Sequence, residues 1–164
     1  MTDPLAETFP GLAAGGYRIT SPESDSYNCL AWVASRNDRW WWPHPDAFWP
    51  EGAPLATTLA AFEAAYRMLG YTPRPGANFE LRFEKIAIFA DAMGTPTHAA
   101  RQLDSGKWTS KLGRSVDIEH ASPDALNGPS YGSPALFMDR RRPLWRWPMA
   151  VLKRTLAMLH ACLL

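Results

Sequence analysis

The sequence predicts an α+β domain in which N-terminal helices pack on a small antiparallel sheet. Two observations carry this prediction. Apolar residues recur at the spacing of a helix in the first half of the chain, whereas the second half changes to the period of strands from residue 84 onward. The 164 residues suit one domain with a real hydrophobic core.

The composition divides the chain into three parts. Residues 1–24 are rich in Gly, Pro, Ser and acidic residues, and we expect an irregular lead-in. Residues 25–139 contain the predicted helices and strands and form the single α+β domain. Residues 140–164 are basic and then mostly apolar, with apolar residues at intervals of three and four, which predicts a C-terminal helix.

Two helices are expected in the first half of the chain. Residues 24–26 supply candidate N-caps for the first helix, which places Cys29 in its first turn. The second helix is expected over residues 54–70, where Pro54 suits the start and the final glycine suits the end. Between the helices, residues 37–50 contain three prolines and four tryptophans, which predicts a packed aromatic loop.

Four strands are expected in the second half, at residues 84–91, 97–103, 107–113 and 133–139. The second and third strands form a hairpin over a three-residue loop, in which Gly106 supplies the positive φ that such a loop needs. A short helix is expected at residues 122–127, with a serine as its cap and a proline at its first position.

Charge and composition exclude several classes of protein. Residues 1–138 carry 11 basic and 15 acidic side chains, a charge of −4, and residues 139–164 carry 6 and 1, a charge of +5. This division, together with the lack of a nucleic-acid-binding motif, indicates that the protein does not bind nucleic acid. With no P-loop or GxGxxG motif, no cofactor is expected.

The number and spacing of cysteines and histidines do not predict a metal centre. The two cysteines do not make a disulfide framework, and we expect reduced thiols. A metal site built from Cys29, His98 and either His120 or Asp91 is an alternative that lacks zinc-type spacing. We therefore expect no metal.

The ends of the chain bear on localisation and partners. The first residues include acids and prolines and do not read as a signal peptide, and the apolar run at residues 155–164 is too short to span a bilayer. We expect a cytoplasmic protein, or one exported without a cleaved leader. The predicted tail helix is expected to dock on the domain or on a sister chain. Contact with a membrane surface, helped by Arg140–Arg142 and Arg146, is the alternative.

Cys29 is the strongest candidate for chemistry. A thiolate is the reactive form of cysteine, and the free N–H groups and dipole of a helix N-terminus stabilise that anion. A nucleophilic cysteine also needs a base. His98 opens a predicted strand beside two alanines that leave room around its ring. A Cys29–His98 dyad is therefore the hypothesis for the site.

The predicted hairpin supplies a third member. Its register places Ser110 on the face of His98 and diagonal to it, about 7–8 Å away between Cα atoms. A loop one residue shorter or longer would bring Lys111 to that face instead. Gln102 shares the face of His98 as well. Among the other histidines, His44 lies in the aromatic loop, where it lines a pocket or caps a turn.

This arrangement resembles the NlpC/P60 branch of the papain-like fold. Those enzymes place a cysteine at the start of a helix packed on an antiparallel sheet, a histidine at the start of a strand and a polar residue on the next strand. Their Gly-Lys turn matches residues 106–107, and their polar residue twelve positions after the histidine matches Ser110. The resemblance implies that Cys29 is the nucleophile, His98 the base and Ser110 the residue that orients the base.

The same resemblance implies an oxyanion hole made by Tyr27 or Asn28 together with the backbone N–H of Cys29. Two features depart from the NlpC/P60 pattern. The third residue there is usually His, Asn, Asp or Gln, and the usual Asp-Cys-Ser-Gly is replaced by the sequence at residues 28–31. The chain is also similar, and more closely, to a bacterial family of unknown activity that shares the motifs YNCLAW, WWWP, HAARQ and WTSKLG.

The predicted function is a cysteine-dependent amide hydrolase or acyl transferase of the peptidase, amidase or deamidase type, acting on a peptide or amide substrate. Candidates for the walls of its substrate cleft are Trp40, Trp41, Trp42 and His44. The alternative is a non-catalytic interaction module on the same fold. In that case the aromatic loop or the C-terminal helix forms the partner surface.

Overall fold

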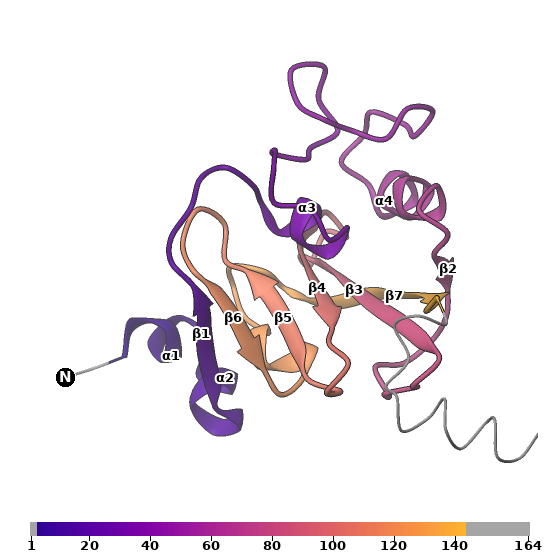
Figure 1. The fold of residues 1–164 in the computed structure, drawn as a ribbon. Helices are drawn as coiled ribbons and strands as arrows, with labels where there is room; N and C mark the ends of the chain where they lie inside the picture. Colours follow the sequence, from indigo (N-terminus) through magenta and orange to yellow (C-terminus); the bar gives the residue numbers. More distant parts are fainter. Residues whose placement is uncertain (1–2, 144–164) are drawn as a thin grey trace, which may run out of the picture.

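A seven-stranded antiparallel sheet organises the protein, in the order β1-β6-β5-β4-β3-β7-β2 (Figure 1). The structure is a computed structural model, and it describes residues 3–143. The strands are β1 (Tyr17–Ser21), β2 (Thr72–Pro73), β3 (Phe83–Ala90), β4 (Pro96–Gln102), β5 (Trp108–Lys111), β6 (Asp117–His120) and β7 (Ser133–Arg141).

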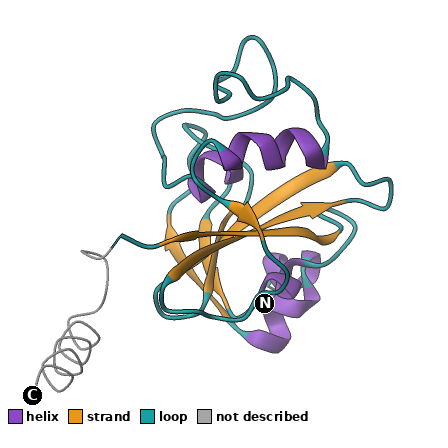
Figure 2. Cartoon of the chain, turned by 90° about the vertical axis from the view of Figure 1, so that its right-hand side faces the viewer, coloured by secondary structure: helices purple, strands orange, loops and turns teal. Residues whose placement is uncertain are grey.

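Short helices cover both faces of the sheet (Figure 2). They are α1 (Pro4–Thr8), α2 (Pro10–Gly15), α3 (Cys29–Val33), α4 (Leu59–Arg67) and the 3-10 helix η1 (Pro123–Leu126). Helices α3 and α4 lie on one face, and α1, α2 and η1 lie on the other. The sheet is therefore the middle layer of three.

Each face of the sheet has its own hydrophobic core. The α3–α4 core contains sheet residues such as Ile88 and Ala99 together with Phe62 of α4. The α1–α2 core contains Phe89 and Ala100 together with residues of the helices on that side. Neighbouring residues of one strand enter different cores because side chains alternate between the faces of a sheet.

The prediction of an α+β protein with an antiparallel sheet is confirmed, and so is the register of the hairpin. Strands β4 and β5 pair Arg101 with Thr109 and Gln102 with Trp108. Gly106 in the loop between them has a φ of 86°. Strands β3 and β7 and the helix η1 also form where the sequence predicts a strand, a strand and a short helix.

The sheet is larger than the sequence predicts, because β1, β2 and β6 were not expected. The prediction of an irregular segment at residues 1–24 is wrong, since α1, α2 and β1 form there. Asp3 caps α1 by accepting the N–H groups of Leu5 and Ala6. Prolines at the first positions of α1 and α2 start these helices. The prediction was wrong because a composition rich in proline also indicates a loop when the positions of the prolines are not considered.

The predicted helix starts also need correction. Helix α3 begins at Cys29 with Asn28 as its N-cap, later than residues 24–26. Helix α4 begins at Leu59 with Thr58 as its N-cap, later than Pro54. The predicted tail helix falls in residues 144–164, outside the described residues.

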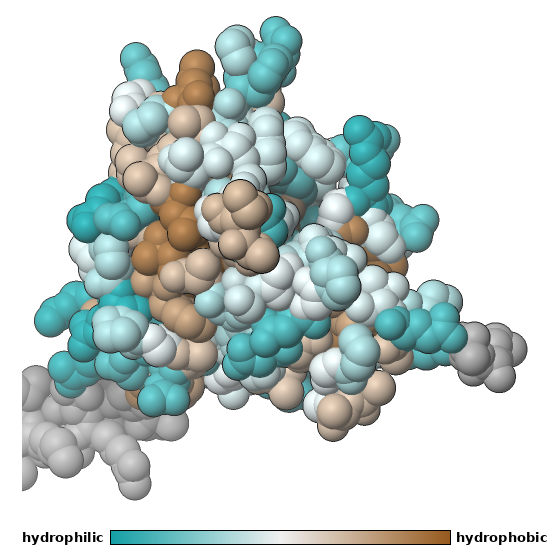
Figure 3. Space-filling model, turned by 180° about the vertical axis from the view of Figure 1, so that it is seen from behind, coloured by the Kyte–Doolittle hydropathy of each residue, from teal (hydrophilic) through white to brown (hydrophobic). Residues whose placement is uncertain are grey.

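Large exposed hydrophobic side chains come from separate segments of the described chain, namely Ile19, Phe48, Leu55, Met68, Phe79 and Met93. Seen from behind, hydrophobic residues form a limited band among hydrophilic and neutral ones (Figure 3). No helix within residues 3–143 is long and apolar enough to cross a membrane.

Candidate functional site

Cys29 occupies the first position of α3, as the sequence predicts. The N-cap before it, Asn28, uses its side-chain oxygen to accept the N–H of Ala31 at 3.1 Å. The same side chain donates to the carbonyl of Trp41 at 2.6 Å and accepts the N–H of Trp41 at 3.2 Å. Asn28 therefore joins the start of α3 to the aromatic loop, and its amide is engaged in these bonds.

The Cys29 thiol lies in the α3–α4 core, where the residue is only 8% exposed. Burial raises the pKa of this thiol to about 11, and the backbone N–H groups of Ala99 and Leu30 lower the pKa by less. The thiol is therefore protonated at neutral pH. A protonated and buried thiol is a weak nucleophile.

His98 lies in a different environment from Cys29. Its strand partner is Phe89, a member of the α1–α2 core. The ring of Tyr131 stacks on the imidazole at 4.0 Å between centroids, and the ring of Phe89 meets it edge-on at 5.2 Å. Among the described residues, neither ring nitrogen of His98 has a hydrogen-bond partner. The thiol and the imidazole are therefore not joined by a hydrogen bond.

The protonation state of His98 follows from this packing. Burial lowers its pKa to about 3, with a smaller contribution from His120. His98 is consequently neutral at physiological pH. It could accept a proton only after gaining solvent or a negative partner.

Ser110 lies on the face that the sequence predicts, but its partner is His120. The Ser110 hydroxyl is 3.0 Å from Nε2 of His120, and Nδ1 of that ring is 2.7 Å from the carbonyl oxygen of Ser122. A carbonyl only accepts, so Nδ1 carries the proton and Ser110 donates to Nε2. The alternation of side chains along residues 117–120 could have predicted a strand that places His120 beside Ser110. So short a segment was not predicted as a strand.

Tyr27 and Lys111 meet in a buried polar cluster with Asp117. The Tyr27 hydroxyl donates to Asp117 at 2.6 Å. Lys111 Nζ lies 3.9 Å from the Asp117 carboxylate and 5.0 Å from the centre of the Tyr27 ring, and it donates to the carbonyl of Ser115. Burial raises the pKa of Tyr27 and lowers the pKa of Lys111. Tyr27 is thus engaged with Asp117.

Gln102 secures the β4–β5 hairpin. Its amide nitrogen donates to the carbonyls of Ala77 and Gly106, each at 3.1 Å. The side chain therefore ties the hairpin loop to the connector that precedes β3. These hydrogen bonds give Gln102 a structural role, and its amide nitrogen does not orient His98.

The aromatic loop, which we call the Trp loop (residues 37–50), is packed against α4 and contributes Trp41 and Trp49 to the α3–α4 core. Trp41 is buried, and Trp42 and Trp49 contact the ring of Phe62 at 6.1 and 5.2 Å. Arg114 lies over the ring of Trp40. These rings therefore mainly support the fold.

His44 caps a turn within the Trp loop, one of the two roles that the sequence allows for it. Its Nδ1 accepts the N–H of Asp46 at 3.2 Å.

A pocket of about 360 Å³ opens beside the Trp loop; we call it the Trp-loop pocket. Its lining combines apolar residues of three segments with charged residues. The residues are Ala34, Arg36, Asp38, Arg39, Trp41, Phe48, Pro50, Leu69 and Arg140. Of the predicted cleft residues, Trp41 contributes to this pocket. The arginines were not predicted, since they belong to no motif and Arg140 lies about a hundred positions after Arg36 and Arg39 in the chain.

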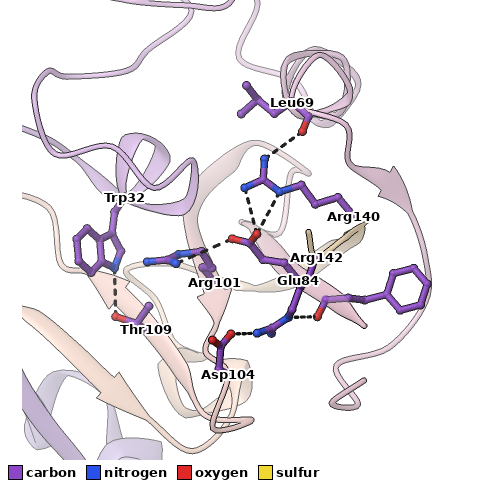
Figure 4. A network of polar contacts seen from close by, with 9 residues as sticks. Trp32, Leu69, Glu84, Arg101, Asp104, Thr109, Arg140 and Arg142 are labelled. Atoms are coloured by element: carbon purple, nitrogen blue, oxygen red, sulfur yellow. Dashed lines mark hydrogen bonds and ion pairs between the residues drawn. The ribbon is translucent and has the colours of Figure 1, made fainter. Parts of the chain in front are cut away.

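Arg140, on β7, lines the pocket. Its guanidinium is held from two sides, by Glu84 and by the Leu69 carbonyl (Figure 4). Its Nε and Nη2 each lie 3.1 Å from the Glu84 carboxylate, and Nη1 donates to the carbonyl of Leu69 at 3.1 Å. Arg140 also lies over the ring of Tyr71 at 4.5 Å. Its guanidinium is therefore positioned before any ligand arrives.

Within residues 3–143, no group of three or more His, Cys, Asp or Glu side chains is arranged to hold a metal ion.

The chain was also compared with models of known protein families. A family model described as Domain of unknown function (DUF7689) matches residues 18–139. The chain belongs to this family. The matched segment contains Cys29, His98, Ser110 and the Trp loop, and Arg140 follows it directly. The searches of curated proteins and of solved structures found no match.

Proposed function

We propose that the protein is a non-catalytic interaction module and that the Trp loop forms its partner surface. The observation that carries this proposal is the Trp-loop pocket. It combines an apolar wall with charged side chains, of which Arg140 is anchored by Glu84 and the Leu69 carbonyl, and binding pockets generally combine these features. Asn28 and the packed tryptophans hold the loop in position. A binding surface on a fixed loop loses little entropy when a partner binds.

The environments of Cys29 and His98 support this choice. A catalytic dyad needs sulfur and imidazole within hydrogen-bond reach. Cys29 contributes to the α3–α4 core, and His98 stacks on Tyr131 on the other side of the sheet. Burial also favours the neutral form of both groups. All of these contacts are those of structural residues.

Selection of short random peptides displayed on phage tests the proposal. Peptides selected on the wild-type protein are expected to lose roughly tenfold or more in affinity for an Ala34→Phe variant. Ala34 lines the pocket, so the added ring would fill it. The matched control is Ala14→Phe, which adds the same ring at an exposed position of α2. Circular dichroism would establish that both variants fold.

Two outcomes would contradict the proposal. One is a selection that enriches no peptide. The other is a set of peptides that bind Ala34→Phe as well as they bind the wild-type protein and Ala14→Phe.

A second candidate is a cysteine hydrolase on a papain-like fold, and one observation favours it. The thiol of Cys29 lies at a helix start near the backbone N–H of Ala99, the residue next to His98. Both ring nitrogens of His98 lack partners among the described residues. In this mechanism His98 takes the thiol proton and the thiolate attacks an amide carbonyl. The C–N bond breaks, the amine leaves with the proton from His98, and water then hydrolyses the acyl-enzyme to release the acid and free the thiol. The imidazole would first have to leave its stack on Tyr131.

A further inference from the structure

The charges around the Trp-loop pocket are unbalanced. Three arginines line it, Arg36, Arg39 and Arg140, against the single carboxylate of Asp38. They come from three places in the fold: the turn after α3, the Trp loop and β7. The fold therefore gathers positive charge at one opening, although the described chain outside it is rich in acidic residues.

The arginines differ in how strongly they are already engaged. Glu84 and the Leu69 carbonyl hold Arg140, whose side chain is 27% exposed. These bonds use three of the five N–H groups of a guanidinium. Arg39 pairs with Asp38 at 2.9 Å, but both side chains are exposed, and such pairs contribute little. Within residues 3–143, Arg36 forms no ion pair within 4.0 Å. A ligand carboxylate can therefore gain contacts here at small cost.

The apolar part of the lining favours a ligand with an apolar group beside its charge. Ala34, Pro50 and Leu69 contribute aliphatic surface. A volume of about 360 Å³ lies at the small end of ligand pockets. The pocket thus suits the end or a short stretch of a peptide.

Nucleic acid fits the pocket less well than a peptide does. Base stacking needs a free aromatic face. The Phe48 ring already carries the guanidinium of Arg39 at 5.2 Å, and Trp41 is buried. The charge of −4 on residues 1–138 would also repel a polyphosphate chain, whereas a single carboxylate meets only the local arginines.

We infer that the Trp-loop pocket binds a peptide through a carboxylate flanked by an apolar side chain. The arginines receive the carboxylate, and the aliphatic wall receives the apolar side chain. The carboxylate has two possible sources in a peptide, the C-terminus or an acidic side chain. This inference rests on the proposed interaction function and specifies the chemistry of its partner.

Fluorescence titration with three matched peptides tests the inference. The probes are acetyl-Gly-Gly-Phe with a free C-terminus, the same peptide as its C-terminal amide, and the amide of acetyl-Gly-Asp-Phe. At least one carboxylate-bearing peptide is expected to bind about tenfold or more tightly than the uncharged amide. The stronger of the two charged probes identifies the source of the carboxylate. Added salt should reduce the difference.

Variants locate the effect in the pocket. Arg36→Gln is expected to remove most of the preference for the charged peptide. Arg18→Gln is the matched control, because Arg18 is an exposed arginine on the edge strand β1 and does not line the Trp-loop pocket. An equal loss in both variants would overturn the assignment to the pocket.

The two proposals fail in different ways. Equal affinity for the charged and uncharged peptides would overturn the carboxylate inference. The interaction function would still stand if Ala34→Phe abolished that binding. Failure of all three probes to bind would also overturn the inference. The interaction function itself would be overturned only by an empty phage selection or by selected peptides that bind Ala34→Phe as well as the wild-type protein.

Discussion

The side chain of Asn28 forms two hydrogen bonds with the backbone of Trp41, a residue thirteen positions later in the chain. The same side chain caps α3 through the N–H of Ala31. One buried amide thus connects the helix that begins with Cys29 to the loop that forms the binding pocket. The position of the pocket consequently depends on Asn28.

Replacing Asn28 by Ala should reduce the free energy of unfolding by about 2–4 kcal/mol. The change removes an N-cap, worth about 1 kcal/mol, and leaves the buried backbone groups of Trp41 unpaired at about 1–3 kcal/mol. Urea denaturation measures this loss. Asn127→Ala is the control, since Asn127 is exposed and its side chain donates a hydrogen bond to Asp124 three residues earlier. Similar small losses in both variants would contradict the role assigned to Asn28.

The two buried histidines should make the protein less stable in acid. Burial lowers the pKa of His98 to about 3 and the pKa of His120 to about 4, whereas both are near 6.5 in the unfolded chain. Between these values the unfolded chain binds more protons. The free energy of unfolding should therefore fall as pH drops below about 6.5, by up to about 1.4 kcal/mol per pH unit for each histidine.

A His98→Phe variant isolates one of these contributions. Phenylalanine keeps a ring beside Tyr131 but cannot titrate. Denaturation should be measured at several pH values between 4 and 7. The free energy of unfolding of the variant should change with pH by about one proton less than that of the wild type. An unchanged slope would mean that His98 is not the titrating group.

Alkylation by iodoacetamide should distinguish a structural Cys29 from a catalytic one. In a Cys162→Ser background, Cys29 should react far more slowly in the folded protein than in urea at neutral pH, because burial raises its pKa to about 11. His98→Ala should leave this slow rate unchanged. Fast alkylation that slows about tenfold or more in His98→Ala would instead favour the hydrolase.

Removal of Arg140 should destabilise the fold through Glu84. The Glu84 carboxylate is 4% exposed, and Arg140→Met would remove two N–H contacts to it at 3.1 Å while leaving Arg101 at 3.9 Å. We expect a loss of about 1–3 kcal/mol in the free energy of unfolding, less than for a fully buried pair because Arg140 is partly exposed. Adding Glu84→Gln should recover part of the loss. Arg39→Met, at an exposed pair, should cost less than about 1 kcal/mol.

Local patterns were sufficient for several elements. Alternation and the loop glycine predicted the register of β4 and β5, which places Ser110 on the face of His98. A polar residue before a helical run predicted Cys29 at the start of α3, although the cap proved to be Asn28. By contrast, β2 has two residues and β6 has four, and such short strands depend on pairing with distant neighbours.

The sequence by itself determined the α+β class, the hairpin register and the helix that starts at Cys29. These features depend on residues close together in the chain, where turn chemistry and side-chain periodicity act directly. Only the tertiary structure decided which face of the sheet meets which helix. Ala99 packs in the same core as Cys29, so its neighbour His98 points to the opposite face, against Tyr131. Because side chains alternate along a strand, Ala99 and His98 must point to opposite faces of the sheet. The sequence pattern does not reveal which of the two faces α3.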